Sequence, residues 1–384
     1  MRILYVSNSS SIGGAPAALL NLVRYLSARH EIGVVLPDPD GPLNKELEAL
    51  GVRCWTSVKY RITVWPGLMN PIKYMKRLYD LLFGKRKVSQ YIAEIIDEFR
   101  PDVVHTNVGP LDYAFQVCKE RGIPHVWHLR EIQNNMTFFP SRKVFIQLIH
   151  DSANSPVAIT ECVADCWQLG PDAKVVYDGV LDGASLRQPD FTSSKKKCFL
   201  YVGRIEPSKG LEELLKAFNV FHASHKDYRL EIVGRPIGLY SWKCRMYVKM
   251  NGLDNVVSFE GQRKDVNAYM RNAAAVIVPS RGEGFGFVPV EAMACGTAVI
   301  VNDDAGLKEQ MDRGVYLTGK EIGLRYKGVH ALKNCLEYVS DKRNSEELER
   351  MRRAAYGLVN EVYTVERSAN EVESYYQELT GREK

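Results

Sequence analysis

Two carboxylates and several glycines lie together in one stretch, RGEGFGFVPVEAMACGTAVI, at residues 281–300. Glu283 and Glu291 are separated by seven residues. The glycines suit a tight loop whose backbone can approach a ligand, and Pro289 suits the first turn of a following helix. Free N–H groups and the helix dipole make such a helix start favourable for anions. The stretch therefore predicts an anion site flanked by two carboxylates.

Two cations follow another predicted strand. The segment GRIEPSKG, residues 203–210, supplies Arg204 and Lys209 immediately before a predicted helix. A guanidinium can bind a diphosphate through two hydrogen bonds, and an ammonium adds a compact charge. Carboxylates beside such an anion would accept hydrogen bonds from neutral hydroxyls. Together these groups match a nucleotide sugar, whose diphosphate lies between ribose and sugar hydroxyls. Each segment alone also fits a plain alternative, an acidic helix start or a solvated turn.

Both segments resemble, nearly position by position, the E-x7-E and G-R-x-x-x-x-K-G patterns of the family 4 glycosyltransferases (glycosyl transferases group 1). The resemblance implies a retaining enzyme with the GT-B architecture, in which two Rossmann-like α/β domains face each other across a cleft. It assigns Glu291 to the ribose hydroxyls of the donor and Glu283 to its sugar hydroxyls. Arg204 and Lys209 would bind the diphosphate. The donor would also contact the backbone of Gly284, Phe285, Gly286 and Phe287.

The resemblance extends into the N-terminal half of the chain. His128 lies near the end of the apolar segment HVWHLRE, residues 125–131, where the family commonly places a histidine facing the donor sugar. In the first loop, Gly13 and Gly14 match a glycine pair that lies near the donor phosphates and the acceptor. This loop is not G-x-G-x-x-G, so a dinucleotide cofactor is poorly supported. Near residue 180 the chain resembles the N-G-V-D turn of the family, but Asp178 stands where the family has the asparagine.

Alternating strand and helix patterns predict an α/β protein with parallel sheets covered on both faces. A length of 384 residues suits two domains. We expect an N-terminal acceptor-side domain at 1–180, a linker at 181–197 and a nucleotide-sugar domain at 198–362. The final helix, within 363–384, would cross back to the first domain. Residues 134–140 are predicted to form a loop.

Positive charge is concentrated in residues 59–87, where eight basic residues and the single acid Asp80 give a net charge of +7. Apolar residues recur there at helical spacing, with basic residues opposite. This pattern is typical of a helix that lies on an anionic membrane. A helix packed on its own domain with a solvated basic face fits equally well. Nucleic acid is not expected as a partner, because no recognised binding motif accompanies the charge.

The N-terminus has one basic residue and only a short apolar run, so we expect a first strand there and not a signal peptide. No stretch approaches the roughly 18 apolar residues needed to span a bilayer. We therefore expect a cytoplasmic protein, peripheral on the inner face of the membrane. The resemblance implies a UDP- or GDP-linked donor, a glycan or lipid-linked acceptor, and a role in cell-surface polysaccharide or glycoconjugate assembly. No cofactor or metal is expected, because cations already serve the diphosphate. Asp303 and Asp304 are interpreted as a solvated turn.

Two other functions stay open. A sugar-nucleotide epimerase with the GT-B fold would release an epimer without any acceptor. A non-catalytic partner subunit would stabilise a true transferase. The presence of both glutamates and both cations argues against that second alternative.

Overall fold

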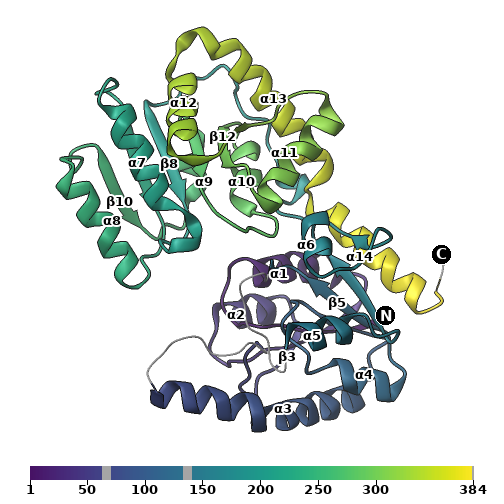
Figure 1. The fold of residues 1–384 in the computed structure, drawn as a ribbon. Helices are drawn as coiled ribbons and strands as arrows, with labels where there is room; N and C mark the ends of the chain where they lie inside the picture. Colours follow the sequence, from purple (N-terminus) through teal and green to yellow (C-terminus); the bar gives the residue numbers. More distant parts are fainter. Residues whose placement is uncertain (63–70, 133–140, 383–384) are drawn as a thin grey trace. The chain divides into compact units, whose positions relative to one another are not determined.

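The computed structural model describes residues 1–62, 71–132 and 141–382, which form two compact units (Figure 1). Unit 1 comprises Met1–Gly179 and Val365–Lys384, and unit 2 comprises Val180–Thr364. The predicted loop at 134–140 and part of the basic segment, residues 63–70, lie outside the described residues.

Unit 1 is built on a seven-stranded parallel sheet with the order β3-β2-β1-β4-β5-β6-β7. Its central strand β1 is the apolar run RILYV, and it is almost fully buried, as expected for a parallel strand covered on both faces. The strands are β1 (Arg2–Val6), β2 (Glu31–Val35), β3 (Arg53–Trp55), β4 (Val103–Thr106), β5 (His125–Leu129), β6 (Asn154–Ala158) and β7 (Lys174–Val175).

Helices cover both faces of this sheet. One core contains side chains of α1, α2 and the C-terminal helix α14, and the other contains side chains of α3 and α4. Ala369, Val372 and Tyr376 of α14 are buried in the first core. The helices of unit 1 are α1 (Ala15–Leu26), α2 (Pro42–Ala49), α3 (Pro71–Phe99), α4 (Phe115–Arg121), α5 (Arg142–Ile149), α6 (Glu161–Cys166) and α14 (Val365–Leu379).

Unit 2 repeats the arrangement with a six-stranded parallel sheet of order β10-β9-β8-β11-β12-β13. Its strands are β8 (Cys198–Val202), β9 (Arg229–Val233), β10 (Val257–Gly261), β11 (Ala275–Val278), β12 (Ala298–Asn302) and β13 (Leu324–Tyr326). Its helices are α7 (Leu211–His222), α8 (Gly238–Met250), α9 (Val266–Asn272), α10 (Phe287–Ala294), α11 (Ala305–Thr318), α12 (Gly328–Ser340) and α13 (Ser345–Val362).

In both sheets the strand order reverses beside the first strand of the unit. The reversal lies between β1 and β4 in unit 1, and between β8 and β11 in unit 2. Ligands of open α/β sheets bind outside the carboxyl ends of the strands at such a switch point. The structure thus confirms the predicted pair of Rossmann-like domains and identifies one such edge in each.

Some predicted elements differ from the structure. A helix was expected within residues 59–87, but α3 continues without a break to Phe99. Gly84 is tolerated, because one glycine inside a helix costs only about 1 kcal/mol. Helix α8 was not predicted from the sequence, because its residues have little amphipathic periodicity. The segment 181–197 was expected to be a linker, but it is grouped with unit 2, and its Phe191 is buried.

Candidate functional site

The loops after β8 and β11 bring Lys209 and Glu283 into direct contact at the switch point of unit 2. The Lys209 ammonium forms an ion pair with the Glu283 carboxylate, and each side chain is 22% exposed. Lys209 ends a short 3₁₀ turn, Pro207–Lys209, just before α7. The prediction placed these groups on neighbouring parts of one ligand, and the structure brings them together.

Close backbone packing fixes these two loops relative to each other. A Cβ added to Gly210 would lie 1.9 Å from the carbonyl oxygen of Pro279, so only glycine fits there. The Arg281 N–H donates to the carbonyl of Ser208 at 2.9 Å. The loop that carries the cations is therefore tied to the loop that carries the carboxylate.

The start of α11, which follows β12, supports the glycine-rich loop. The Gly282 N–H donates to the Asp304 carboxylate at 2.8 Å. The amide of Gln310, which is 1% exposed, donates to the carbonyls of Phe285 at 2.7 Å and Gly286 at 2.9 Å. A Cβ on Gly306 would lie 2.3 Å from the carbonyl oxygen of Gly284, so this contact also requires glycine.

Asp304 and Gln310 are positioning residues that were not predicted from the sequence. Asp304 was interpreted as part of a solvated turn, but it begins α11 and holds the glycine-rich loop. An aspartate before a periodic segment is a signal for a helix start that could have been used. No local pattern marks Gln310, because its partners lie about 25 residues earlier in the chain. Ala305 has a φ of 49°, a region that favours glycine, at the position where the family has a glycine pair.

Glu291 lies on α10, the helix that follows the glycine-rich loop. Gly286 caps this helix without any side-chain hydrogen bond, so its first N–H groups are not capped by a side chain. Burial raises the pKa of Glu291. No hydrogen bond or ion pair of its carboxylate is found within residues 1–62, 71–132 and 141–382. A half-buried carboxylate of this kind is suited to accept hydrogen bonds from ligand hydroxyls.

Arg204 extends from the loop after β8, and its side chain is 62% exposed. Its guanidinium lies 2.9 Å from the Glu206 carboxylate. Its backbone is fixed, because the buried Tyr201 hydroxyl donates to the Arg204 carbonyl at 2.8 Å. The backbone anchor leaves the guanidinium able to reach an anion at the strand end.

In unit 1 the predicted residue His128 is part of a buried polar network. His128 is 1% exposed, and its Nδ1 lies 3.2 Å from both the Nε2 of His105 and a guanidinium nitrogen of Arg130. Burial lowers the pKa of His128 well below its ordinary value, and the charge of Arg130 lowers it further. His128 is therefore neutral near pH 7, and its contact with a donor sugar stays a prediction.

The same network explains the aspartate at position 178. Asp178 and Arg130 form a buried ion pair, in which an asparagine would leave the guanidinium without a countercharge. On its other side the network reaches α14, since the Nδ1 of His105 lies 2.5 Å from the Tyr376 hydroxyl.

The glycine pair of the first loop lies at the carboxyl end of β1. Gly14 has φ 53° and ψ −126°, a conformation that essentially requires glycine, and it begins α1 without a side-chain cap. A Cβ on either Gly13 or Gly14 would meet no atom within 4 Å, so nearby atoms leave room at this edge. Their contact with a donor or acceptor stays a prediction.

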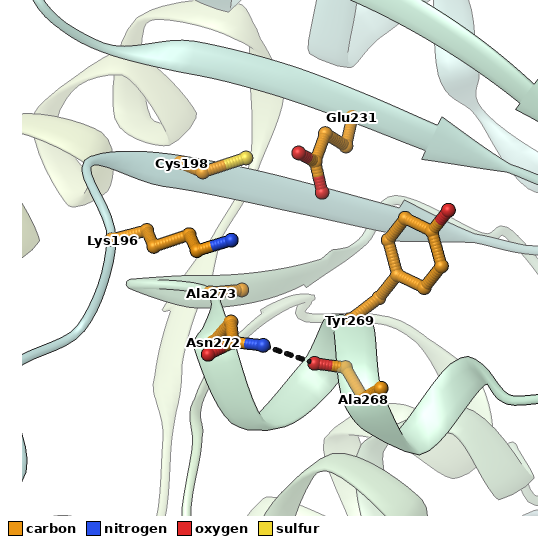
Figure 2. A pocket seen from close by; sticks show the side chains of 7 residues that line it. All are labelled: Lys196, Cys198, Glu231, Ala268, Tyr269, Asn272 and Ala273. Carbon is orange, nitrogen blue, oxygen red and sulfur yellow. Dashed lines mark hydrogen bonds between the residues drawn. The ribbon is translucent and has the colours of Figure 1, made fainter.

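A cavity of about 270 Å³ lies at the opposite, amino-terminal edge of the unit 2 sheet (Figure 2). Figure 2 shows Cys198 and Glu231 on one side of it and Asn272 on the other, with the Asn272 amide donating to the Ala268 carbonyl at 2.8 Å. Burial raises the pKa of the Cys198 thiol to about 12, so the thiol is not a nucleophile at neutral pH.

Within the described residues, no group of three or more His, Cys, Asp or Glu side chains is arranged to hold a metal ion.

Two family models match the chain. The model described as glycosyl transferases group 1 matches residues 184–358, and the model described as glycosyltransferase family 4 matches residues 12–180. They correspond closely to the two units of the fold.

Curated relatives are similar at lower coverage. A phosphatidyl-myo-inositol mannosyltransferase of Mycolicibacterium smegmatis is 29% identical over 309 residues, which are 76% of this chain and 72% of that protein. An uncharacterized glycosyltransferase of Methanocaldococcus jannaschii is 28% identical over 213 residues, 54% of each chain. The match thus spans about half the length of the archaeal relative.

Solved structures with the same fold cover nearly the whole chain. Anabaena HepE in complex with UDP has a TM-score of 0.77 at 20% identity, covering 98% of this chain and 100% of its own. A glycosyltransferase from Rickettsia africae has a TM-score of 0.76 at 18% identity, covering 100% of this chain and 99% of its own. At these identities the likeness shows the fold alone.

Glu131, at the end of the segment that carries His128, gives a pH-dependent prediction. Burial raises its pKa from 4.5 to about 7, although its carboxylate accepts a hydrogen bond from the Gly109 N–H at 3.0 Å. The folded state therefore binds more protons than the unfolded state between these values, and stability falls as the pH rises through this window. We expect Glu131→Gln to be more stable than wild type at pH 8, with a free energy of unfolding higher by about 3 kcal/mol at most, as measured by denaturant titration. The difference should shrink toward pH 5. If the free energies of unfolding of the two proteins changed in parallel with pH, the raised pKa of Glu131 would be contradicted.

Proposed function

The chain belongs to the glycosyl transferases group 1 family, and we propose that it transfers a sugar from a nucleotide-sugar donor to a hydroxyl group of an acceptor. The observation that carries this proposal is the contact of Lys209 with Glu283 at the switch point of unit 2, beside the uncapped start of α10. One site there offers a cation for phosphate and carboxylates for hydroxyls. A nucleotide sugar needs both.

Each residue has a proposed role in holding the donor. Arg204 and Lys209 bind the diphosphate, Glu283 binds sugar hydroxyls, and Glu291 binds the ribose hydroxyls. The backbone from Gly284 to Phe287 contacts the sugar. Asp304 and Gln310 contact no ligand in this proposal, and they keep the glycine-rich loop in place. Anabaena HepE, which has the same fold, was solved in complex with UDP and with UDP-glucose, and this supports a UDP-linked donor.

The reaction breaks the bond between the sugar C1 and the leaving diphosphate, and forms a bond from C1 to the acceptor oxygen. The acceptor hydroxyl loses its proton to the leaving phosphate. Negative charge grows on the diphosphate as the first bond breaks, so fixed cations stabilise the transition state more than the ground state. We propose retention of configuration by this front-face route, without a metal ion bridging the diphosphate.

Substitutions in the donor site test the proposed function. We expect Lys209→Ala and Glu291→Ala each to lower the release of nucleoside diphosphate from a UDP- or GDP-sugar by about 10²–10³-fold, since each removes a partner of the donor. Lys216→Ala is the matched control, because Lys216 is an exposed lysine on α7 that pairs with Glu212. Wild-type turnover by a folded Lys209→Ala protein would contradict the diphosphate assignment. Release of an epimerised sugar nucleotide without acceptor would favour an epimerase.

Metal independence is tested separately. Because the cations of the protein are proposed to balance the diphosphate, we expect turnover to survive an excess of EDTA within about twofold. A loss of turnover that added Mn²⁺ or Mg²⁺ restores would show that a divalent ion takes part.

We further propose that the protein works at the cytoplasmic face of a membrane, in the assembly of a cell-surface glycan, on a glycan or lipid-linked acceptor. Helix α3 supports this proposal, because its N-terminal half exposes a stripe of apolar side chains. Ile72 is 80% exposed, Met75 61%, Tyr79 62% and Phe83 65%. We call these four residues the α3 stripe. No helix in the described residues is long and apolar enough to span a bilayer.

Vesicle co-sedimentation tests this attachment. Burying an apolar side chain contributes about 1.5–3 kcal/mol, so we expect Ile72→Ser/Met75→Ser/Phe83→Ser to weaken binding to phosphatidylglycerol vesicles at least about tenfold. High salt should also weaken the wild type, because it screens the basic residues. The control is Leu239→Ser/Met250→Ser, which changes two equally exposed apolar residues of α8. Equal binding by all three proteins would refute attachment through α3.

A further inference from the structure

A cavity of about 640 Å³ lies in unit 1 and has no role in the donor site described above. It is bordered by the carboxyl ends of β1 and β2, by residues 59–62, and by the N-terminal half of α3. Four basic side chains line it: Lys59, Arg61, Lys76 and Arg77.

The irregular wall of this cavity is firmly anchored. The hydroxyl of Tyr60, which is 6% exposed, donates to the carbonyls of Ser7 at 2.6 Å and Val35 at 2.9 Å. The Tyr113 hydroxyl donates to the carbonyl of Arg61 at 2.6 Å, and the rings of the two tyrosines meet edge to face. Residues 60 and 61 are thus held against the ends of β1 and β2.

The basic residues of the cavity are poorly neutralised. Lys59 lies 3.8 Å from the Asp38 carboxylate, and both of these side chains are largely exposed. Within the described residues, neither Arg61, Lys76 nor Arg77 has a carboxylate within 4.0 Å. Among the described residues of the lining, Asp80 is the other acid, so these residues carry an excess of positive charge.

Arg77 is held in a fixed position among these cations. Its guanidinium donates to the Ile62 carbonyl at 2.6 Å, which links α3 to the anchored wall. Burial lowers the pKa of Arg77, and the charge of Arg61 lowers it further. Arg61 and Arg77 both line the cavity, and guanidinium groups are suited to bind the oxygens of a phosphate or diphosphate.

The neighbouring face of the same helix is apolar. Lys76, Arg77, Asp80, Gly84 and Val88 follow one another at helical spacing along the cavity, and the α3 stripe lies beside them. Helix α3 therefore presents a cation-lined cavity next to a surface suited to lipid. An acceptor with a phosphate group and an apolar chain would match both.

We propose that this cavity binds the phosphate or diphosphate group of the acceptor, separately from the α3 stripe that contacts lipid. The assignment to an acceptor rests on the proposed function, whereas binding of the anion does not. Some of the charge of residues 59–87 then serves recognition inside a cavity, and the rest faces outward.

Calorimetric titration with inorganic pyrophosphate tests the anion site. We expect two sites on the wild type. Arg61→Gln/Arg77→Gln should weaken one of them about tenfold or more, and Arg204→Gln/Lys209→Gln should weaken the other. Arg86→Gln/Lys87→Gln is the matched control on α3, because both residues are exposed and outside the cavity lining. Since Arg77 also links α3 to the wall, the single variant Lys76→Gln provides a milder test, with a smaller loss at the same site.

Phosphatidylglycerol vesicles distinguish a lipid headgroup from a separate phosphate. We expect Arg61→Gln/Arg77→Gln to keep vesicle binding within about threefold, whereas the triple serine variant of the α3 stripe loses it and keeps both pyrophosphate sites. A single pyrophosphate site that only Arg204→Gln/Lys209→Gln removes would overturn the proposal. If Arg61→Gln/Arg77→Gln lost vesicle binding but kept both pyrophosphate sites unchanged, that result would also overturn the proposal. Two pyrophosphate sites on a protein that fails to turn over any nucleotide sugar would refute the proposed function and leave the anion site standing.

Discussion

Opposite charges held at the ends of two neighbouring parallel strands are the constraint on which the donor site depends. Lys209 follows β8 and Glu283 follows β11, and the strand order reverses between these strands. Their contact requires loops packed so closely that glycine alone fits at residues 210 and 306. A site with fixed charges needs little reorganisation when negative charge develops on a ligand, which is the condition for electrostatic stabilisation of a transition state.

The glycine-rich loop has almost no regular structure of its own, so its shape depends on its neighbours. Asp304 and Gln310, at the start and in the second turn of α11, satisfy its backbone N–H and carbonyl groups. Buried backbone groups without partners would be costly, so these contacts select one loop conformation. Unit 1 uses a comparable device, in which the buried pair of Arg130 and Asp178 lies beside His128. In both units, neighbouring side chains hold the proposed site residues in place.

Much of the fold could be predicted from the sequence, because apolar strands and amphipathic helices alternate throughout. As predicted, strand β8 precedes the two cations, α7 follows them, and α14 lies within residues 363–384. The glycine-rich loop and the two cations could be recognised from residue types and spacing. The supporting roles of Asp304 and Gln310 could not, since they depend on contacts between loops that are distant in sequence. Nor could the sequence show that His128 is buried or that the apolar side of α3 is exposed, because periodicity alone does not reveal what covers a helix face.

The central claim is that unit 2 recognises the diphosphate of a nucleotide sugar through Lys209 and its neighbours. The most direct measurement is calorimetric binding of UDP, GDP and dTDP beside the matching nucleoside monophosphates. We predict that one diphosphate binds at least about tenfold more tightly than its monophosphate, and that Lys209→Gln removes this preference. Equal affinity for the diphosphate and the monophosphate, or an unchanged preference in Lys209→Gln, would contradict the claim.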